Sequence, residues 1–225
     1  SMSVPYYVSP EQIIADKAEF ARKGIARGRS VVVASAEDAI YFIADNPSRT
    51  LHKIGEIYDK IGFAAVGRYN EFENLRVAGV RLADTRGYSY DRGDVTVRTI
   101  ANAYAQTLGS IFIEAAKPFE VEIAVAEVGD RPDLDQLYRI SFDGSVHDEA
   151  GFISMGGDSE NVGNVMKDNW SIGSGARETV RAAVIALNPD GEQGLDSLEV
   201  ATLIRGRAGR SFRRCSQDDI TELLG

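Results

Sequence analysis

A helix signal precedes the first strand signal of this chain, and this order constrains the fold more than any other feature. Ser9 and Pro10 open the segment, because serine can accept from a free backbone amide and proline needs no amide partner in the first turn. Gln12 stands where a capping box would return a bond to the backbone. Apolar residues then recur on one side at helical spacing, at Ile14, Ala18, Ala21 and Ile25. We expect a helix over residues 9–27 that buries this stripe before a strand begins at Ser30.

The composition indicates one globular domain. The chain has 225 residues, of which 44% are hydrophobic and 26% charged, and this suffices for a single sizeable core. Its net charge of -9 disfavours nucleic acid or an anionic membrane as a partner. No run approaches the roughly 20 apolar residues of a membrane span, and the single Cys215 suits a reducing compartment. We expect one domain over residues 1–225, a cytoplasmic location, and no metal or cofactor.

Strand and helix signals alternate in blocks along the chain. Strands are predicted from β-branched and aromatic runs at 30–36, 39–44, 53–58, 61–66, 119–128, 136–142, 151–155 and 198–204. Helices are predicted over 9–27, from Phe72 to Leu82, from Asp94 to Ile111, over 161–169 and 174–187, and from Gln217. This block order favours two stacked antiparallel sheets with helices on both outer faces.

Several motifs of other protein classes fail on inspection. His52 and His147 are the only histidines, and neither has a serine in a nucleophile elbow. Residues 188–199 approach a calcium-binding loop, but Gln193 stands at the sixth position, which requires glycine. The arginine-rich run 205–210 has no interleaved aromatic residue, so a solvated connection between strands is a better interpretation than an RNA site.

Five separated motifs, in this order, resemble the α subunits of actinobacterial proteasomes. They are EFARKGIARG at 19–28, DNPSR at 45–49, KI at 53–54, FAAVG at 63–67 and DTRGYSYD at 84–91. The resemblance extends from Ser9 to near the C-terminus. It implies the αββα sandwich of N-terminal-nucleophile hydrolases. It also implies seven-membered α rings that cap two rings of catalytic β subunits, ATPase or other activators on the outer face, and unfolded proteins as substrates in transit.

The resemblance also implies which residues of this chain match the catalytic residues of the β subunits. Catalytic β relatives use a threonine whose freed N-terminal amine serves as the base, tuned by an acid and a lysine. Asp45 and Lys53 match the positions of that acid and lysine, but the nucleophile position falls near Arg29, behind a helix. We expect a noncatalytic subunit. One alternative is a self-processing hydrolase of the same fold, matured by cleavage before Ser30, and another is a homomeric carrier ring without proteolytic partners.

Two binding sites follow from the resemblance. Lys53 matches the lysine that receives the C-terminal carboxylate of an activator tail, with Gly28 offering close backbone approach and Glu19 positioning Lys53 or touching the activator. Residues 1–8 match the gate peptides that converge on the ring axis. The residues assigned to the gate are Val4, Pro5, Tyr6, Tyr7, Val8, Ser9 and Pro10. Phe20 replaces a tyrosine of archaeal relatives, so we expect order-to-disorder switching of the peptide and not a cluster of hydroxyl groups.

Overall fold

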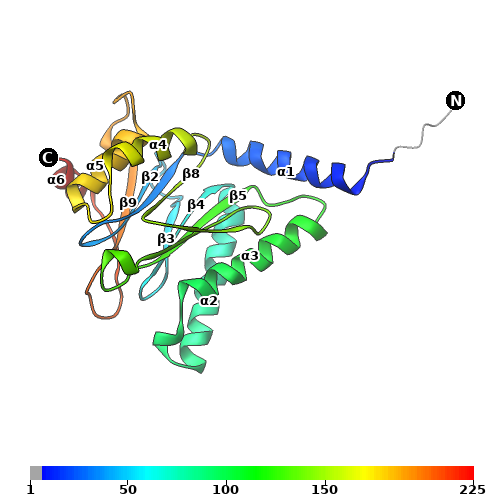
Figure 1. The fold of residues 1–225 in the computed structure, drawn as a ribbon, viewed down its shortest axis with the longest axis horizontal. Helices are drawn as coiled ribbons and strands as arrows, with labels where there is room; N and C mark the ends of the chain where they lie inside the picture. Colours follow the sequence, from blue (N-terminus) through cyan, green and yellow to red (C-terminus); the bar gives the residue numbers. More distant parts are fainter. Residues whose placement is uncertain (1–6) are drawn as a thin grey trace.

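Within residues 7–225, which the computed structural model describes, ten strands form two stacked antiparallel sheets (Figure 1). The first sheet has the order β10-β9-β2-β1-β8 and the second β3-β4-β5-β6-β7. The strands of the first sheet are β1 (Val31–Ser35), β2 (Ala39–Asp45), β8 (Phe152–Met155), β9 (Leu198–Ile204) and β10 (Phe212–Arg214). Those of the second are β3 (Ile54–Tyr58), β4 (Ile61–Gly67), β5 (Val121–Glu127), β6 (Gln136–Ile140) and β7 (Val146–Glu149).

Helices cover the outer face of each sheet, which confirms the predicted four-layer sandwich. Helices α2 (Tyr69–Ser89) and α3 (Val97–Glu114) pack on the second sheet (Figure 1). The first sheet carries α4 (Ser159–Asn169), α5 (Ala176–Leu187) and α6 (Gln217–Leu224). Short 3-10 helices lie at η1 (Arg92–Asp94), η2 (Pro132–Leu134) and η3 (Leu195–Ser197). None of the helices in the described part of the chain combines the length and apolarity needed to cross a membrane.

The central strands are buried on both faces, which explains their continuous apolar sequences. In β1, Val31 and Val33 pack between the two sheets, whereas Val32 and Ala34 pack under α4 and α5. Side chains of a strand alternate between its faces, so each face of β1 contributes to a different apolar layer. The interior therefore has three apolar layers, one between the sheets and one beneath the helices on each outer face.

Helix α1 (Pro10–Ala26) begins as predicted but is only partly buried by its own chain. The Ser9 hydroxyl accepts from the Gln12 amide at 3.1 Å, with Pro10 at the first position. The expected capping box does not close, because the Gln12 side chain donates to Asp16 instead. Of the apolar stripe, Ala21 and Ile25 are buried, whereas Ile14 is 54% exposed.

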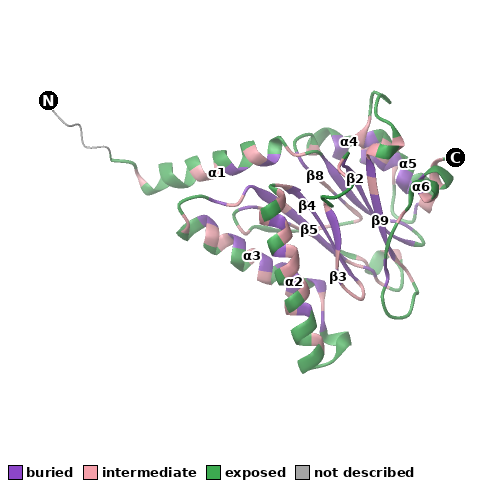
Figure 2. Cartoon of the chain, turned by 180° about the vertical axis from the view of Figure 1, so that it is seen from behind, coloured by how far each residue is buried: buried purple, intermediate pink, exposed green. Residues whose placement is uncertain are grey.

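The free end of α1 projects beyond the sandwich. Figure 1 shows the helix extending sideways from the sheets above the end of α3, and Figure 2 shows mainly exposed residues along its outer half. The chain itself therefore buries only the C-terminal part of the stripe. The apolar side chains of the outer half remain available to another molecule.

Two short edge strands and one helix start differ from the sequence prediction. The polar strand β7 pairs with β6, and β10 pairs with β9, although neither has an alternating apolar pattern. Helix α3 begins after the cap Thr96 and not at Asp94, which closes η1. The Thr96 hydroxyl accepts from the Thr99 amide at 3.3 Å, so a local side-chain bond decides where this helix starts.

Candidate functional site

The position that matches the nucleophile of catalytic relatives lies where α1 leads into β1. Arg29 occupies it, and the next residue, Ser30, is buried. The backbone on both sides is fixed: the Gly157 amide donates to the Gly28 carbonyl at 3.2 Å, and the Asp45 amide to the Ser30 carbonyl at 3.2 Å. A guanidinium is not a nucleophile, and a residue inside a chain has no free amine to act as a base.

The structure brings Asp45 and Lys53 together around Arg29, the arrangement that the resemblance implies. Asp45 ends β2, and its carboxylate pairs with the Arg29 guanidinium at 3.1 Å. Lys53 precedes β3, and its ammonium donates to the Arg29 carbonyl at 2.8 Å. The acid and the lysine are therefore in place, but each of them binds the arginine that occupies the nucleophile position.

Burial lowers the pKa of Lys53 to about 8, even though the nearby carboxylates Asp45 and Glu199 act in the opposite direction. Burial leaves the charged amine poorly solvated. The positive charge of the neighbouring Arg29 lowers the pKa of Lys53 further. An anion that reached the amine would relieve the penalty of burial. This arrangement suits a lysine that receives a carboxylate.

Glu199 holds the backbone of this site and was missed by the sequence analysis. Its carboxylate accepts from the Lys53 and Ile54 amides at 2.9 and 3.2 Å, and from the Asn46 side chain at 2.8 Å. The Arg214 guanidinium donates to the same carboxylate at 3.0 Å. One signal was present in the sequence, since Glu199 is the only charged residue within the apolar run of β9.

Gly28 lines a hollow of about 480 Å³ between the end of α1 and the start of α2. A Cβ at Gly28 would lie 3.0 Å from the Ile25 carbonyl oxygen and 3.3 Å from the Gly67 nitrogen, so the close packing here favours glycine. The residues around the hollow are Phe20, Gly24, Arg27, Gly28, Gly67, Arg68 and Glu120. Lys53 is not among them and contacts the carbonyl of the next residue, Arg29, instead.

Glu19 lies on the exposed surface of α1 and pairs with Lys23 at 3.1 Å, one turn further along. The expectation that it positions Lys53 is therefore not met within this chain. Of the predicted gate residues, Tyr7 is 84% and Val8 45% exposed, Ser9 is half-buried as the helix cap, and Pro10 is exposed. The gate residues Val4, Pro5 and Tyr6 lie outside the described residues.

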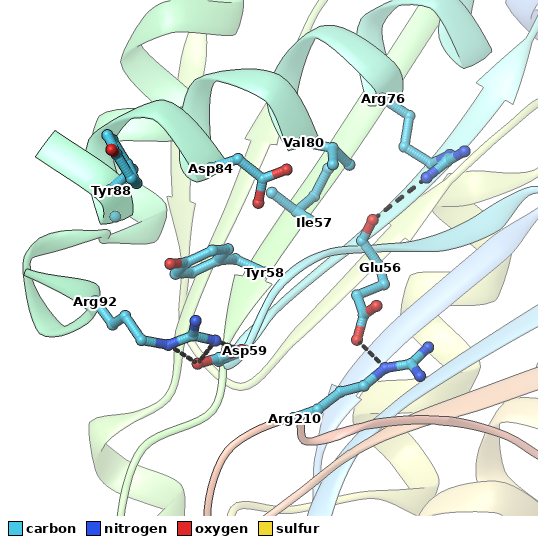
Figure 3. Close-up of a pocket in the computed structure, with 11 residues that line it drawn as sticks. Glu56, Ile57, Tyr58, Asp59, Arg76, Val80, Asp84, Tyr88, Arg92 and Arg210 are labelled. Atoms are coloured by element: carbon cyan, nitrogen blue, oxygen red, sulfur yellow. Dashed lines mark hydrogen bonds and ion pairs between the residues drawn. The ribbon is translucent and has the colours of Figure 1, made fainter.

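A second hollow, of about 850 Å³, lies between α2 and β3, away from Lys53 (Figure 3). Most of its charges neutralise one another. Arg92 binds the Asp59 carboxylate through two nitrogens at 2.7 and 3.1 Å, and Arg210 pairs with Glu56 at 2.6 Å. This hollow therefore presents no concentrated field of one sign to a ligand.

The arginine-rich run differs from its prediction at its first residue. Arg205 is buried and pairs with the buried carboxylate of Asp135 at 2.6 Å, whereas Arg207 and Arg210 are exposed in the β9–β10 connection. Only the second part of the run is the solvated connection that we expected. Among residues 7–225, no three metal-ligating side chains of the types His, Cys, Asp and Glu cluster together.

Comparisons with known proteins identify relatives of this chain. The family model described as "Proteasome subunit" matches residues 23–193. The "Proteasome subunit alpha" of Kineococcus radiotolerans is 57% identical over 99% of this chain and 98% of its own length. Those of Thermobifida fusca and Acidothermus cellulolyticus are 58% and 59% identical, over 99% of this chain and 91% and 98% of their own lengths. The chain therefore belongs to the proteasome subunit family, among the α subunits of actinobacteria.

Proposed function

We propose that this chain is the noncatalytic subunit of the outer rings of a proteasome core particle. Seven copies form a ring, control the passage of unfolded proteins to the catalytic β subunits, and receive ATPase or other activators through their C-terminal tails. Such a particle would work in the cytoplasm.

The main support for this proposal is the residue at the nucleophile position, which cannot act as a nucleophile. Arg29 stands there, and both the acid Asp45 and the amine of Lys53 are bonded to it. Cleavage before Ser30 would remove α1, although Ala21 and Ile25 of this helix are part of the layer between the sheets. Leaving such apolar sites empty is costly in a close-packed interior. A self-processing hydrolase predicts a mature chain that begins at Ser30, whereas we expect intact-mass measurement to find the preceding residues retained.

The gate is supported by the exposed end of α1. Tyr7, Val8, Ile13 and Ile14 are each 45% or more exposed, at or just before the N-terminal end of α1. Isolated exposed apolar residues are common, but a cluster of them on a projecting helix favours contact with other protein. Copies of this end, brought together around a ring axis, could bury these side chains against each other.

The activator site is supported by the charge and packing around Arg29. Lys53 provides an amine whose pKa is lowered by burial, and Gly28, next to Arg29 in the chain, lines the hollow between α1 and α2. Arg68 adds a second cation at the rim of the hollow next to Gly28, because its ion pair with Glu120 is long, at 3.5 Å. Glu19, paired with Lys23 on the outer face of α1, would contact the activator.

The experiment for this site is the Lys53→Met variant, assembled with the catalytic subunit of the same host. A synthetic peptide with the C-terminal residues of an activator is added, and hydrolysis of a fluorogenic substrate is measured. We expect stimulation to fall by about tenfold or more, because the carboxylate of the tail loses the cation with which it pairs. Lys167→Met, an exposed lysine at the end of α4, is the matched control and should respond as the wild type does. Unchanged stimulation of the Lys53 variant would remove Lys53 from the site.

Purification from the native host separates the proposal from a carrier ring. We expect a catalytic β subunit to accompany the chain, identified by mass spectrometry. A homomeric ring without that partner would contradict the assignment to a core particle.

A further inference from the structure

Lys17 of α1 donates hydrogen bonds to the carbonyl groups at the C-terminal end of α3. The Lys17 ammonium donates to the carbonyl oxygens of Phe112, Ile113 and Ala115 at 3.0, 3.3 and 2.8 Å. An ammonium has three donors, and all three are used on these carbonyls. Phe112 and Ile113 belong to the last turn of α3, and Ala115 caps it.

The sequence of α3 explains why this contact is favourable. The last carbonyls of a helix have no partners within the helix, and they carry partial negative charge. The last turn of α3 contains no basic residue, so α3 lacks a cation of its own there. Lys17 supplies both the donors and the positive charge from a different element, about 95 residues earlier in the sequence.

The place of Lys17 along α1 gives the contact a second consequence. Towards the C-terminal end of the helix, Ala21 and Ile25 are buried in the sandwich. Towards the other end, Ile13 and Ile14 are exposed. Among the hydrogen bonds and ion pairs that join α1 to other elements of residues 7–225, those of Lys17 lie nearest to its N-terminal end.

A second contact joins the same two segments. Lys117, which follows α3, lies 5.4 Å from the centre of the Phe20 ring of α1. Such a cation and ring attract each other weakly at an exposed position. Helix α1 therefore rests on the segment 112–117, and Lys17 makes the polar part of that contact.

We propose that Lys17 is a positioning residue that fixes the direction of the outer half of α1, and thereby the place of the gate peptide. The proposal rests on the gating role proposed above. Without Lys17, the outer half of α1 has no polar tie to the body, and the helix is free to move about its buried end. The peptides of neighbouring copies then no longer meet in one arrangement, and passage through the ring becomes easier.

The first experiment measures hydrogen exchange of the full-length chain. Lys17→Met keeps the length of the side chain but removes its donors and its charge. We expect exchange of the amides of residues 13–17 to become about tenfold faster, while residues 21–26 stay protected by the sandwich. Lys23→Met is the matched control on the same helix, because Lys23 is 67% exposed and pairs with Glu19 one turn away. Lys17→Arg keeps the cation and should restore most of the protection.

The second experiment measures peptide hydrolysis by particles assembled with the catalytic subunit, without an activator. We expect Lys17→Met to raise hydrolysis towards the level of a variant that lacks residues 1–8, and Lys23→Met to leave it unchanged. If the deletion accelerates hydrolysis but Lys17→Met does not, the gate stands and the role of Lys17 is overturned. If the deletion itself has no effect, the gating function fails, and hydrogen exchange still decides whether Lys17 holds the helix. Should Lys17→Met not fold, Lys17→Ala, which also lacks the donors and the charge, is measured in the same way, and wild-type exchange in it would overturn the proposal.

Discussion

Replacing Lys53 by methionine should stabilise the chain at neutral pH, although Lys53 lies at the centre of the candidate site. Burial lowers the pKa of Lys53 from 10.5 to about 8. At about 1.4 kcal/mol per pKa unit, holding the proton in the folded state costs at most about 3.5 kcal/mol. Lys53 is only partly buried, so screening by solvent reduces this to roughly half. Losing the bond to the Arg29 carbonyl costs about 1 kcal/mol in return. We therefore expect Lys53→Met to be more stable than the wild type by about 1 kcal/mol at pH 7.

The pH dependence of this stability difference shows whether the charge of Lys53 causes it. Below pH 8 Lys53 is protonated in both the folded and the unfolded chain, so the wild type carries the full penalty. Between pH 8 and 10.5 the folded chain has released this proton and the unfolded chain has not, so the stability of the wild type rises with pH. The advantage of the variant should therefore disappear by about pH 9.5.

The assay is urea unfolding of the wild type and Lys53→Met, each at pH 7 and at pH 9.5. The difference between the two proteins isolates Lys53, because other titrating groups contribute equally to both. A variant that is less stable at pH 7 would refute the reasoning, since Lys53 would then be a net structural tether. If the difference in free energy of unfolding between the two proteins is the same at both pH values, the burial of the Lys53 charge is not its cause.

Two further predictions concern residues that shape the fold. Arg205→Ala leaves the buried Asp135 carboxylate without its cation and should lower the free energy of unfolding by about 3–5 kcal/mol, whereas Arg131→Ala, which breaks an exposed pair, should stay near the wild type in the same urea titration. Gly67→Ala should destabilise by about 2 kcal/mol or more, because Gly67 has φ +111° and its Cβ would overlap the Glu120 carbonyl. Gly93→Ala, where a Cβ meets nothing within 4 Å, is the control, and equal midpoints of thermal unfolding for the two variants would contradict the role of Gly67.

The main elements could be predicted because local sequence decides them. The pair β1 and β2 consists of apolar and β-branched runs on either side of a short turn, and both strands were placed within a residue or two. β7 could not be predicted, because Val146 is its only apolar residue and its pairing with β6 stabilises it. Strand formation there depends on a neighbour and not on its own side chains.

The site was predictable only as far as the resemblance reached. Asp45 and Lys53 were matched to positions of the catalytic relatives, and the structure places both against Arg29. Glu199 and Lys17 were not predicted, because they act across 146 and about 95 residues of sequence on backbone groups. A sequence pattern carries no signal for such long-range partners of the main chain.

The exposure of α1 shows a different limit. The stripe through Ile14 correctly predicts an apolar helix face, but a pattern does not say which molecule covers it. In this chain the body buries Ala21 and Ile25 and leaves Ile14 uncovered. In the arginine-rich run, too, the pattern does not say which side chains are covered. The side chain of Arg205 is buried, whereas that of Arg210 in the same run is exposed.

Whether this chain gates the passage of substrates is tested most directly by the rate of peptide hydrolysis by particles whose α chains lack residues 1–8. The deletion ends before the cap Ser9, so α1 can still form. We expect faster hydrolysis by the same amount of unaltered catalytic subunit, with the particle remaining assembled. An assembled particle with an unchanged rate would contradict the claim that this chain gates the passage of substrates.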